Sequence, residues 1–263
     1  MRRRVVRWSA VVSLVGAAAA GAIYLFVWVS GGTGEASTPI SAPPLPMPTT
    51  PAAPKQASAP AMVASTAQEK ATAAISKGVP TSAVLYRIIP EESQVRFEID
   101  EILRGQPVHV MGTTDQVAGD FIVNFADLSA SQLGTVRINV RTLRTPEQRR
   151  DQAIRSRILE SANDKYEFTV FEPVRLIGLP SAVQMGKSEA FQIVGNLTIR
   201  EITNEVTFNA ELRLIAPNRL AGAAVATIQR RDYDLSIPSV PFVASVGENV
   251  ILGIDFVAAA VSN

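Results

Sequence analysis

Six arginines gather in the middle of the chain, and they are the side chains best suited to bind an anion. The guanidinium group presents paired N–H donors that match a phosphate or carboxylate. Only Glu147 and Asp151 oppose these charges locally. One interpretation is a pocket mouth where Arg150, Arg155 and Arg157 hold the pyrophosphate or carboxylate head group of a ligand; the other is a solvated helix. The six are Arg141, Arg144, Arg149, Arg150, Arg155 and Arg157.

Side chains for acid–base or metal chemistry are scarce. The chain has no cysteine, which excludes disulfides and thiolate metal sites, and its single histidine is His109. A hydrolase would need a nucleophile and an orienting carboxylate around that histidine. Ser131 and Asp127 are available, but no G-x-S-x-G motif is present. The acidic residues do not follow the spacing of a calcium loop. We therefore expect a protein that is not an enzyme, with no cofactor and no metal.

Alternating apolar and polar residues predict the strands that would position these side chains. A period of two indicates a strand with one buried face. The clearest case is 195–212 (GNLTIREITNEVTFNAEL), which reads as two strands joined by a polar turn. One helix is expected over Thr145–Leu159, with Thr145 as its cap and Pro146 in its first turn. Further alternation occurs over 95–99, 121–125, 136–140, 168–176, 220–228 and 250–256.

These patterns predict an all-β fold of about eight antiparallel strands, either a sandwich or a closed barrel. An eight-stranded, lipocalin-like barrel can hold one small ligand. Inward side chains can line a tunnel or fill a core, and small residues over 222–226 can leave room or permit tight packing; both alternatives stay open. The positions expected to face the lumen are Phe97, Ile99, Phe121, Val123, Val136, Ile138, Val140, Phe168, Val170, Leu197, Phe208, Leu212, Ala224 and Phe256.

The N-terminal third has a different composition. Residues 1–7 carry four arginines and are expected to be a cytoplasmic tail, and 8–29 is an uncharged, apolar run long enough to cross a bilayer. We expect an uncleaved signal anchor there; the competing reading is a cleaved signal peptide. Residues 30–82 are rich in Pro, Ala, Ser and Thr, and we expect a disordered linker that acts as a stalk. Residues 83–263 would form the exported domain.

The distribution of charge argues against nucleic acid as a partner. The whole chain has a formal net charge of +1, but residues 1–82 contain seven basic and two acidic side chains. Residues 83–263 therefore hold 18 basic and 22 acidic side chains, a net charge of −4. A mildly acidic domain lacks the basic surface that nucleic-acid binding requires.

Four motifs in chain order resemble the YceI-like family of secreted, lipocalin-like barrels, over about 83–263. The first is Tyr86-Arg-Ile-Ile-Pro-Glu-Glu-Ser-Gln-Val-Arg-Phe97, and the second is the partial match Arg150, Asp151, Arg155, Ser156, Lys165 and Tyr166. The third is Gly195, Leu197, Thr198, Ile199, Thr203 and Val206. The fourth is Arg230-Arg-Asp-Tyr-Asp-Leu235, followed by VGENVILGIDFVA.

The sequence also departs from the family pattern. Ala153 stands where the second motif has a histidine, Ile158 and Leu159 replace paired phenylalanines, and Glu92 occupies a position that often holds histidine. Any role of those family histidines is therefore absent from this chain. Residues 106–115 (QPVHVMGTTD) are interpreted as a variant loop.

The resemblance implies a protein that binds a long isoprenoid or another lipid-like molecule in an apolar lumen. Our first hypothesis is a membrane-anchored, extracytoplasmic barrel of this kind. The alternative is a structural or interaction module on the same stalk, with a filled core and no ligand. The expected partners are a hydrophobic ligand and the membrane that holds the anchor, and a homodimer is left open.

Overall fold

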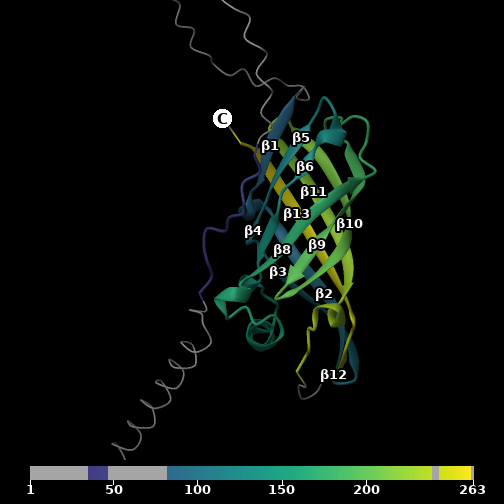
Figure 1. Cartoon of the computed structure of the whole chain (residues 1–263). Helices are drawn as coiled ribbons and strands as arrows, with labels where there is room; N and C mark the ends of the chain where they lie inside the picture. The colour runs from purple at the N-terminus through teal and green to yellow at the C-terminus, as the bar shows by residue number, and fades with distance from the viewer. Residues whose placement is uncertain (1–34, 47–81, 239–242, 262–263) are drawn as a thin grey trace, which may run out of the picture.

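The computed structural model describes residues 35–46, 82–238 and 243–261 (Figure 1). The predicted anchor at 8–29 and most of the predicted linker lie outside these ranges. Within them, no helix is long and apolar enough to cross a membrane. The described part of the linker, residues 35–46, follows an irregular path along the outside of the domain (Figure 1).

The domain is built around one antiparallel sheet, as the alternation predicted, with thirteen strands in the described residues. The strands are β1 (Ala83–Ile88), β2 (Gln94–Leu103), β3 (Gln106–Thr114), β4 (Val117–Ala118), β5 (Asp120–Asn124), β6 (Gln132–Leu133), β7 (Val136–Asn139), β8 (Phe168–Ile177), β9 (Ser188–Ile199), β10 (Ile202–Ala216), β11 (Arg219–Gln229), β12 (Val243–Val246) and β13 (Asn249–Ala260).

The sheet curls so that its two ends approach each other. Its main path runs β4-β7-β8-β9-β10-β11-β13-β1-β5-β6. Strands β4 and β5 stand near opposite ends of this path, yet only Gly119 separates them in the chain. Strand β4 pairs with β7, and β5 pairs with β1. Figure 1 shows the long strands β9, β10, β11 and β13 running side by side and tilted around the resulting interior.

Strand β13 pairs with two different strands along one edge. Its first half, Ile251–Asp255, pairs with β2, and its last residues, Ala258–Ala260, pair with β1. The connection between β1 and β2 is fixed by Ser93, whose hydroxyl donates to the carbonyl of Ile89 at 2.7 Å and accepts from the N–H of Val257 at 3.1 Å. The first family-like motif therefore marks the point where the chain passes from one partner of β13 to the other.

The prediction of about eight strands was too low, and the predicted loop over 106–115 was wrong. Residues Gln106–Thr114 form β3, which pairs with β2 along its whole length. The turn between them is Arg104-Gly105, and both residues have positive φ angles, 53° and 79°. Two successive positive φ angles fit a type I′ turn, whose usual sequence signal is Asn-Gly. Because arginine takes the place of asparagine in the first position, the sequence did not indicate a hairpin.

Residues 82–238 contain one short α-helix, as expected, although it is shorter than predicted. Helix α2 covers Gln148–Ala153 and continues as the π-helical turn η4, Ile154–Ile158. Thr145 is not the N-cap. Instead, the Asp151 carboxylate accepts hydrogen bonds from the N–H and the hydroxyl of Thr145, both at 2.8 Å. Short 3₁₀ turns complete the fold: η1 (Pro90–Glu92), η2 (Leu128–Ala130), η3 (Val140–Thr142), η5 (Asp164–Tyr166) and η6 (Arg230–Tyr233).

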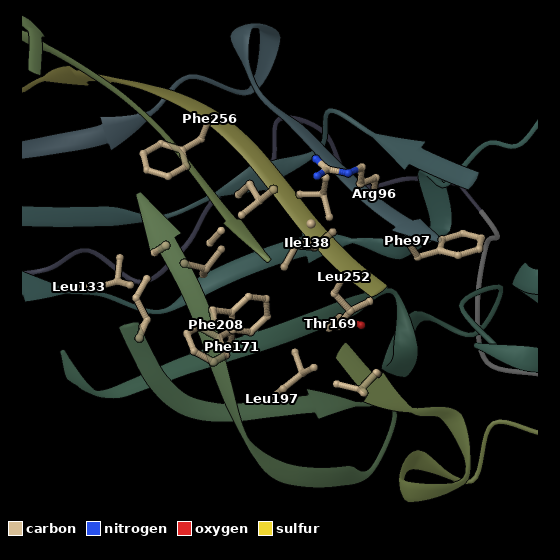
Figure 2. Close-up of a pocket in the computed structure, with 18 of the residues that line it drawn as sticks. Arg96, Phe97, Leu133, Ile138, Thr169, Phe171, Leu197, Phe208, Leu252 and Phe256 are labelled. Carbon is tan, nitrogen blue, oxygen red and sulfur yellow. The ribbon is translucent and has the colours of Figure 1, made fainter. Parts of the chain in front are cut away.

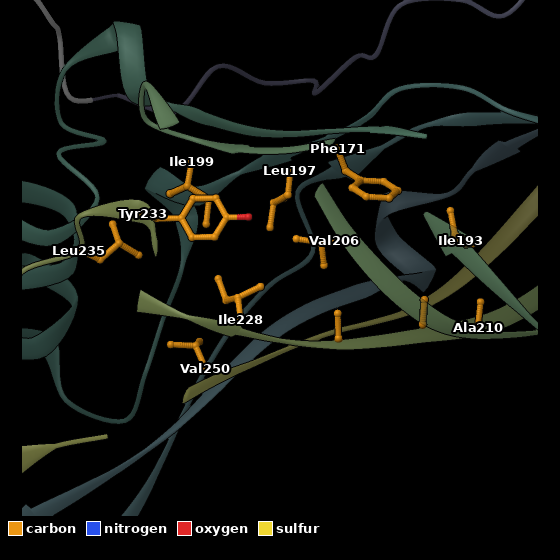
Figure 3. Packing of buried hydrophobic residues seen from close by; sticks show 12 residues of the cluster. Phe171, Ile193, Leu197, Ile199, Val206, Ala210, Ile228, Tyr233, Leu235 and Val250 are labelled. Carbon is orange, nitrogen blue, oxygen red and sulfur yellow. The ribbon is translucent and has the colours of Figure 1, made fainter. Parts of the chain in front are cut away.

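Two clusters of buried apolar side chains stabilise the curled sheet. One surrounds Leu197, Val206 and Ile228 and reaches Tyr233 in η6 (Figure 3). The other surrounds Tyr86, which is fully buried and donates its hydroxyl to the carbonyl of Pro217 at 3.0 Å. Burial raises the pKa of both tyrosines to about 12, so both stay protonated at neutral pH. The clusters hold the wall in shape without filling the interior.

Candidate ligand-binding cavity

A cavity of about 350 Å³ lies inside the curled sheet. Its wall is almost entirely apolar and is contributed by strands from the whole path, together with α2, η4 and the segments that follow β8 and η6. Figure 2 shows Phe171, Phe208, Leu197 and Leu252 among the side chains that project from several strands toward this space. A volume near the lower end of the range for small-molecule sites, about 300–1,000 Å³, suits one slender ligand.

Most of the residues predicted to face the lumen line this cavity. Every one of the fourteen does so except Phe168 and Val170. Those on the wall are Phe97, Ile99, Phe121, Val123, Val136, Ile138, Val140, Leu197, Phe208, Leu212, Ala224 and Phe256. Whether they bind a ligand stays a prediction.

The prediction placed Phe168 and Val170 on the wrong face of β8. Thr169 and Phe171 line the cavity instead. Side chains alternate along a strand, so a shift of one residue exchanges the two faces. Phe168 lies under the guanidinium of Arg137, whose central carbon is 3.9 Å from the ring centroid. A cation–π contact thus accounts for an aromatic residue outside the lumen.

Three glycines give phenylalanine rings room to lie against the wall. A Cβ atom at Gly112 would sit 2.2 Å from the ring of Phe97, and one at Gly222 would sit 2.7 Å from the ring of Phe256. At Gly195 the nearest ring atom, from Phe171, would be 2.6 Å away. Each ring therefore occupies the space that a side chain at the glycine would fill. The rings lie against the wall in this way and leave the centre of the lumen free.

Two alanines widen the cavity further. Ala210 of β10 and Ala224 of β11 are directly opposite each other in the strand pairing, and both line the cavity. Both are buried, at 7% and 6% exposed. Side chains of directly opposed residues lie close together on one face of the sheet. The small-residue pattern over 222–226 therefore makes room at Ala224, whereas Gly222 accommodates the ring of Phe256.

Sequence reasoning missed several lining residues. Ile154, Ile158 and Leu159 come from the excursion formed by α2 and η4, where a short helix gives too few turns for a clear apolar period. Leu252 and Ile254 lie four and two residues before Phe256 in β13, so the period of two that selected Phe256 also identifies them.

The predicted head-group site does not assemble. Arg150 reaches the cavity wall, but Arg155 and Arg157 do not line it. The guanidinium of Arg150 donates to the buried carboxylate of Glu101 at 2.7 Å, rather than pairing with Asp151. A sequence cannot show which face of a short helix turns inward, so the pattern alone could not separate Arg150 from Arg155 and Arg157.

The other cationic side chains on the wall are also paired. Arg96 donates to the Glu98 carboxylate at 2.9 Å and also contacts Asp255. Arg230 lies 3.1 Å from the Glu248 carboxylate. Each arginine on the wall is therefore paired with a carboxylate, and the pairing reduces the positive charge that could attract a phosphate.

His109 lies outside the cavity wall. It is half exposed on β3, with Nδ1 2.8 Å from the Asp100 carboxylate and Nε2 3.2 Å from the Glu98 carboxylate. The hydrogen bond with Asp100 is the main cause that raises the pKa of His109; burial opposes it, and the hydrogen bond with Glu98 adds to the rise. Neither Ser131 nor Asp127 contacts it. Across residues 35–46, 82–238 and 243–261, no three His, Asp or Glu side chains gather as a metal site.

Known proteins share this architecture. A polyisoprenoid binding domain from Saccharophagus degradans, implicated in plant cell wall breakdown, aligns with 68% of this chain and 99% of its own, with a TM-score of 0.51 and 12% identity. BcnA of Burkholderia cenocepacia aligns with 65% of this chain and 99% of its own, with a TM-score of 0.52 and 14% identity. At these identities the likeness shows the fold alone.

A search of curated proteins found no match. A comparison with protein-family models, however, matched residues 86–258 to the YceI-like domain. The match covers more than half of the chain and contains every strand from β2 to β12, together with half of β1 and most of β13. The motifs, the curled antiparallel sheet and this match agree, and the chain belongs to the YceI-like family.

Proposed function

We propose that this chain binds one isoprenoid or other lipid-like amphiphile in the cavity of its curled sheet. The observation that carries the proposal is an apolar wall around unfilled space, at a place where a soluble fold would otherwise pack its core. Each methylene group that leaves water for such a wall contributes about 0.8 kcal/mol. A slender hydrocarbon chain therefore binds tightly without any special chemistry. The similar fold of the Saccharophagus polyisoprenoid binding domain supports the choice of ligand class.

The proposed ligand is recognised mainly through its hydrocarbon part. Arg150 is the member of the predicted head-group set that reaches the wall, and its pairing with Glu101 already uses its charge. A phosphate entering the lumen would have to compete with that carboxylate. We therefore expect a phosphorylated ligand and its alcohol to bind with similar affinity inside the cavity.

The proposal places the domain outside the cytoplasm, held by an N-terminal anchor. Its support is the sequence: four arginines precede an uncharged run at 8–29 that is long enough to span a bilayer. An anchored binder would hold its ligand beside the membrane from which such amphiphiles come. We also propose binding rather than catalysis, because the one histidine is outside the cavity wall and paired with two carboxylates.

The length of the bound chain gives the sharpest test. The full protein, reconstituted in detergent-free nanodiscs, would be titrated with polyprenyl alcohols of increasing length in competition with a fluorescent analogue. We expect affinity to rise with each added isoprene unit and then to level off once the cavity is full. Partition into the nanodisc lipid would keep rising with length. A continuous rise that is identical in empty nanodiscs would contradict a site of fixed volume.

A further inference from the structure

Residues 35–46, which the sequence assigns to a stalk, are docked on the domain. The N–H of Ser37 donates to one oxygen of the Glu167 carboxylate at 2.5 Å, and its hydroxyl donates to the other oxygen at 2.8 Å. Glu167 is 3% exposed and lies directly after η5. A buried carboxylate needs donors on both oxygens, and this segment supplies two of them.

A buried arginine holds the same segment from the other side. Arg141, in η3, has a side chain only 2% exposed, and it donates to the carbonyls of Glu35 and Ser161 and to the Asp164 carboxylate, the last at 2.7 Å. Further along, Arg137 donates to the carbonyl of Ser41 at 3.0 Å. The contacts of the segment thus run antiparallel to β7, and Figure 1 shows it beside β4.

The charge state of Glu167 supports the docked arrangement. Burial alone would raise its pKa, but the hydrogen bonds from Ser37 and Asn139 and the charge of Arg141 outweigh it and lower the pKa. Asn139 donates to this carboxylate at 2.7 Å, and Arg141 lies 3.8 Å from it. Glu167 therefore stays ionised at neutral pH and keeps its attraction for the Ser37 donors.

Docking shortens the connection between the domain and the proposed anchor. The apolar run ends at Val29, so residues 30–34 alone separate it from the docked segment. An extended chain spans at most about 3.5 Å per residue, which gives roughly 20 Å from Val29 to Glu35. Without docking, all of residues 30–82 would lie between the proposed anchor and the domain. The docked segment would therefore hold one end of the domain close to the bilayer.

The end that docking brings closest is basic. Glu35 contacts Arg141, which lies beside the excursion from α2 to η5. This excursion carries Arg149 and Arg157 as exposed side chains and Arg155 as a partly exposed one. Within the described residues, no ion pair joins these three arginines to a carboxylate. Clustered arginines near an anionic bilayer each contribute about 1 kcal/mol of attraction, close to fivefold in population.

We propose that residues 35–46 fix the domain with its α2–η5 end against the anchoring bilayer, where Arg149, Arg155 and Arg157 bind anionic lipid head groups. This inference rests on the proposed anchor. It also gives five of the six arginines separate roles. Arg141 holds the docked segment, Arg150 pairs at the cavity wall, and Arg149, Arg155 and Arg157 face lipid. The same excursion contributes Ile154, Ile158 and Leu159 to the cavity wall, so the segment that would lie against the bilayer also forms part of that wall.

The absence of cysteine allows a direct test of orientation. The full chain would carry a fluorophore at either Gln152→Cys, exposed in α2, or Ser181→Cys, exposed in the segment that follows β8. These sites lie toward opposite ends of β8, whose ten residues span about 33 Å. In vesicles that contain anionic lipid and a lipid-bound quencher, we expect quenching to be several-fold stronger at Gln152 than at Ser181.

Two sets of variants separate the effect of docking from the effect of the exposed arginines. Ser37→Pro removes the N–H that donates to Glu167, so quenching at the two positions should become similar. Ser41→Ala keeps the carbonyl that accepts from Arg137, so the difference in quenching should remain. Arg155→Glu with Arg157→Glu should lower the Gln152 signal by about fivefold or more in anionic vesicles and little in zwitterionic ones. The exposed Arg213, in β10, gives the matched control Arg213→Glu. Circular dichroism would check that each variant is folded.

The outcomes distinguish this inference from the proposed function. Equal quenching at both sites in the unaltered chain, or stronger quenching at Ser181, would overturn the orientation while leaving ligand binding and the anchor in place. A chain that leaves the vesicles in an alkaline wash would overturn the anchor, and the orientation with it. Ligand binding in the cavity would still be judged separately by the polyprenyl titration.

Discussion

Replacing Ala224 by phenylalanine is expected to abolish or strongly weaken ligand uptake while the domain stays folded. Ala224 is buried, lines the cavity and is directly opposite Ala210. The added ring would occupy space in the lumen that the ligand needs. If it displaces about three methylene groups, the loss is roughly 2.5 kcal/mol, or close to two orders of magnitude in Kd. The polyprenyl titration measures this directly.

The neighbouring residue provides a matched control. Ala223 lies on the same strand and is not on the cavity wall, because adjacent side chains of a strand point to opposite faces. Ala223→Phe adds the same ring outside the lumen, so uptake should be unchanged. Equal loss in both variants would mean that β11 is merely disturbed. Unchanged uptake in Ala224→Phe would mean that the ligand binds elsewhere.

Replacing Arg141 by leucine is expected to destabilise the fold by about 3–5 kcal/mol, the usual cost of removing one partner from a buried ion pair. The substitution leaves the Glu167 carboxylate without its cationic neighbour and the Ser161 carbonyl without its donor. Urea denaturation followed by circular dichroism would measure the change in the free energy of unfolding. Arg157→Leu, at an exposed arginine, should change it by no more than about 0.5 kcal/mol.

The difference in the free energy of unfolding between the unaltered protein and Arg141→Leu should depend on pH, because Glu167 titrates. Its pKa in the folded protein is lowered from the ordinary 4.5, so the stabilisation by its partners is complete above pH 4.5 and is lost as the pH falls through the lowered value. The gap between the unaltered protein and Arg141→Leu should therefore narrow on acidification. A gap that stays constant to low pH would contradict a role for Arg141 in keeping Glu167 ionised.

The sequence predicted those parts of the molecule that are governed by a regular period. In β10, Phe208, Ala210 and Leu212 alternate with polar residues, and all three face the cavity. The period fails in β8, where Phe168, Val170 and Phe171 are apolar on both faces and either phase is compatible with the pattern. The single Thr169 could not decide between them, yet it lines the cavity.

Contacts made by the backbone had no signal in the sequence. Apart from the hydroxyl of Ser37, the docking of residues 35–46 uses the N–H of Ser37 and the carbonyls of Glu35 and Ser41. Every residue has a carbonyl, and every residue except proline has an N–H. The segment's Pro, Ala and Ser content was therefore interpreted as a free stalk. The arginine cluster shows the same limit, since Arg141, Arg150 and Arg157 are close in the chain but have different surroundings in the fold.

We expect the lumen to hold an amphiphile, and native mass spectrometry of the full chain released from detergent-free nanodiscs tests this most directly. We predict one adduct per chain, which extraction would identify as an isoprenoid or a similar lipid, and which Ala224→Phe would lose and Ala223→Phe would keep. A bare chain that also takes up no added polyprenyl lipid would contradict the claim. The alternative, an interaction module without a ligand, would then be favoured.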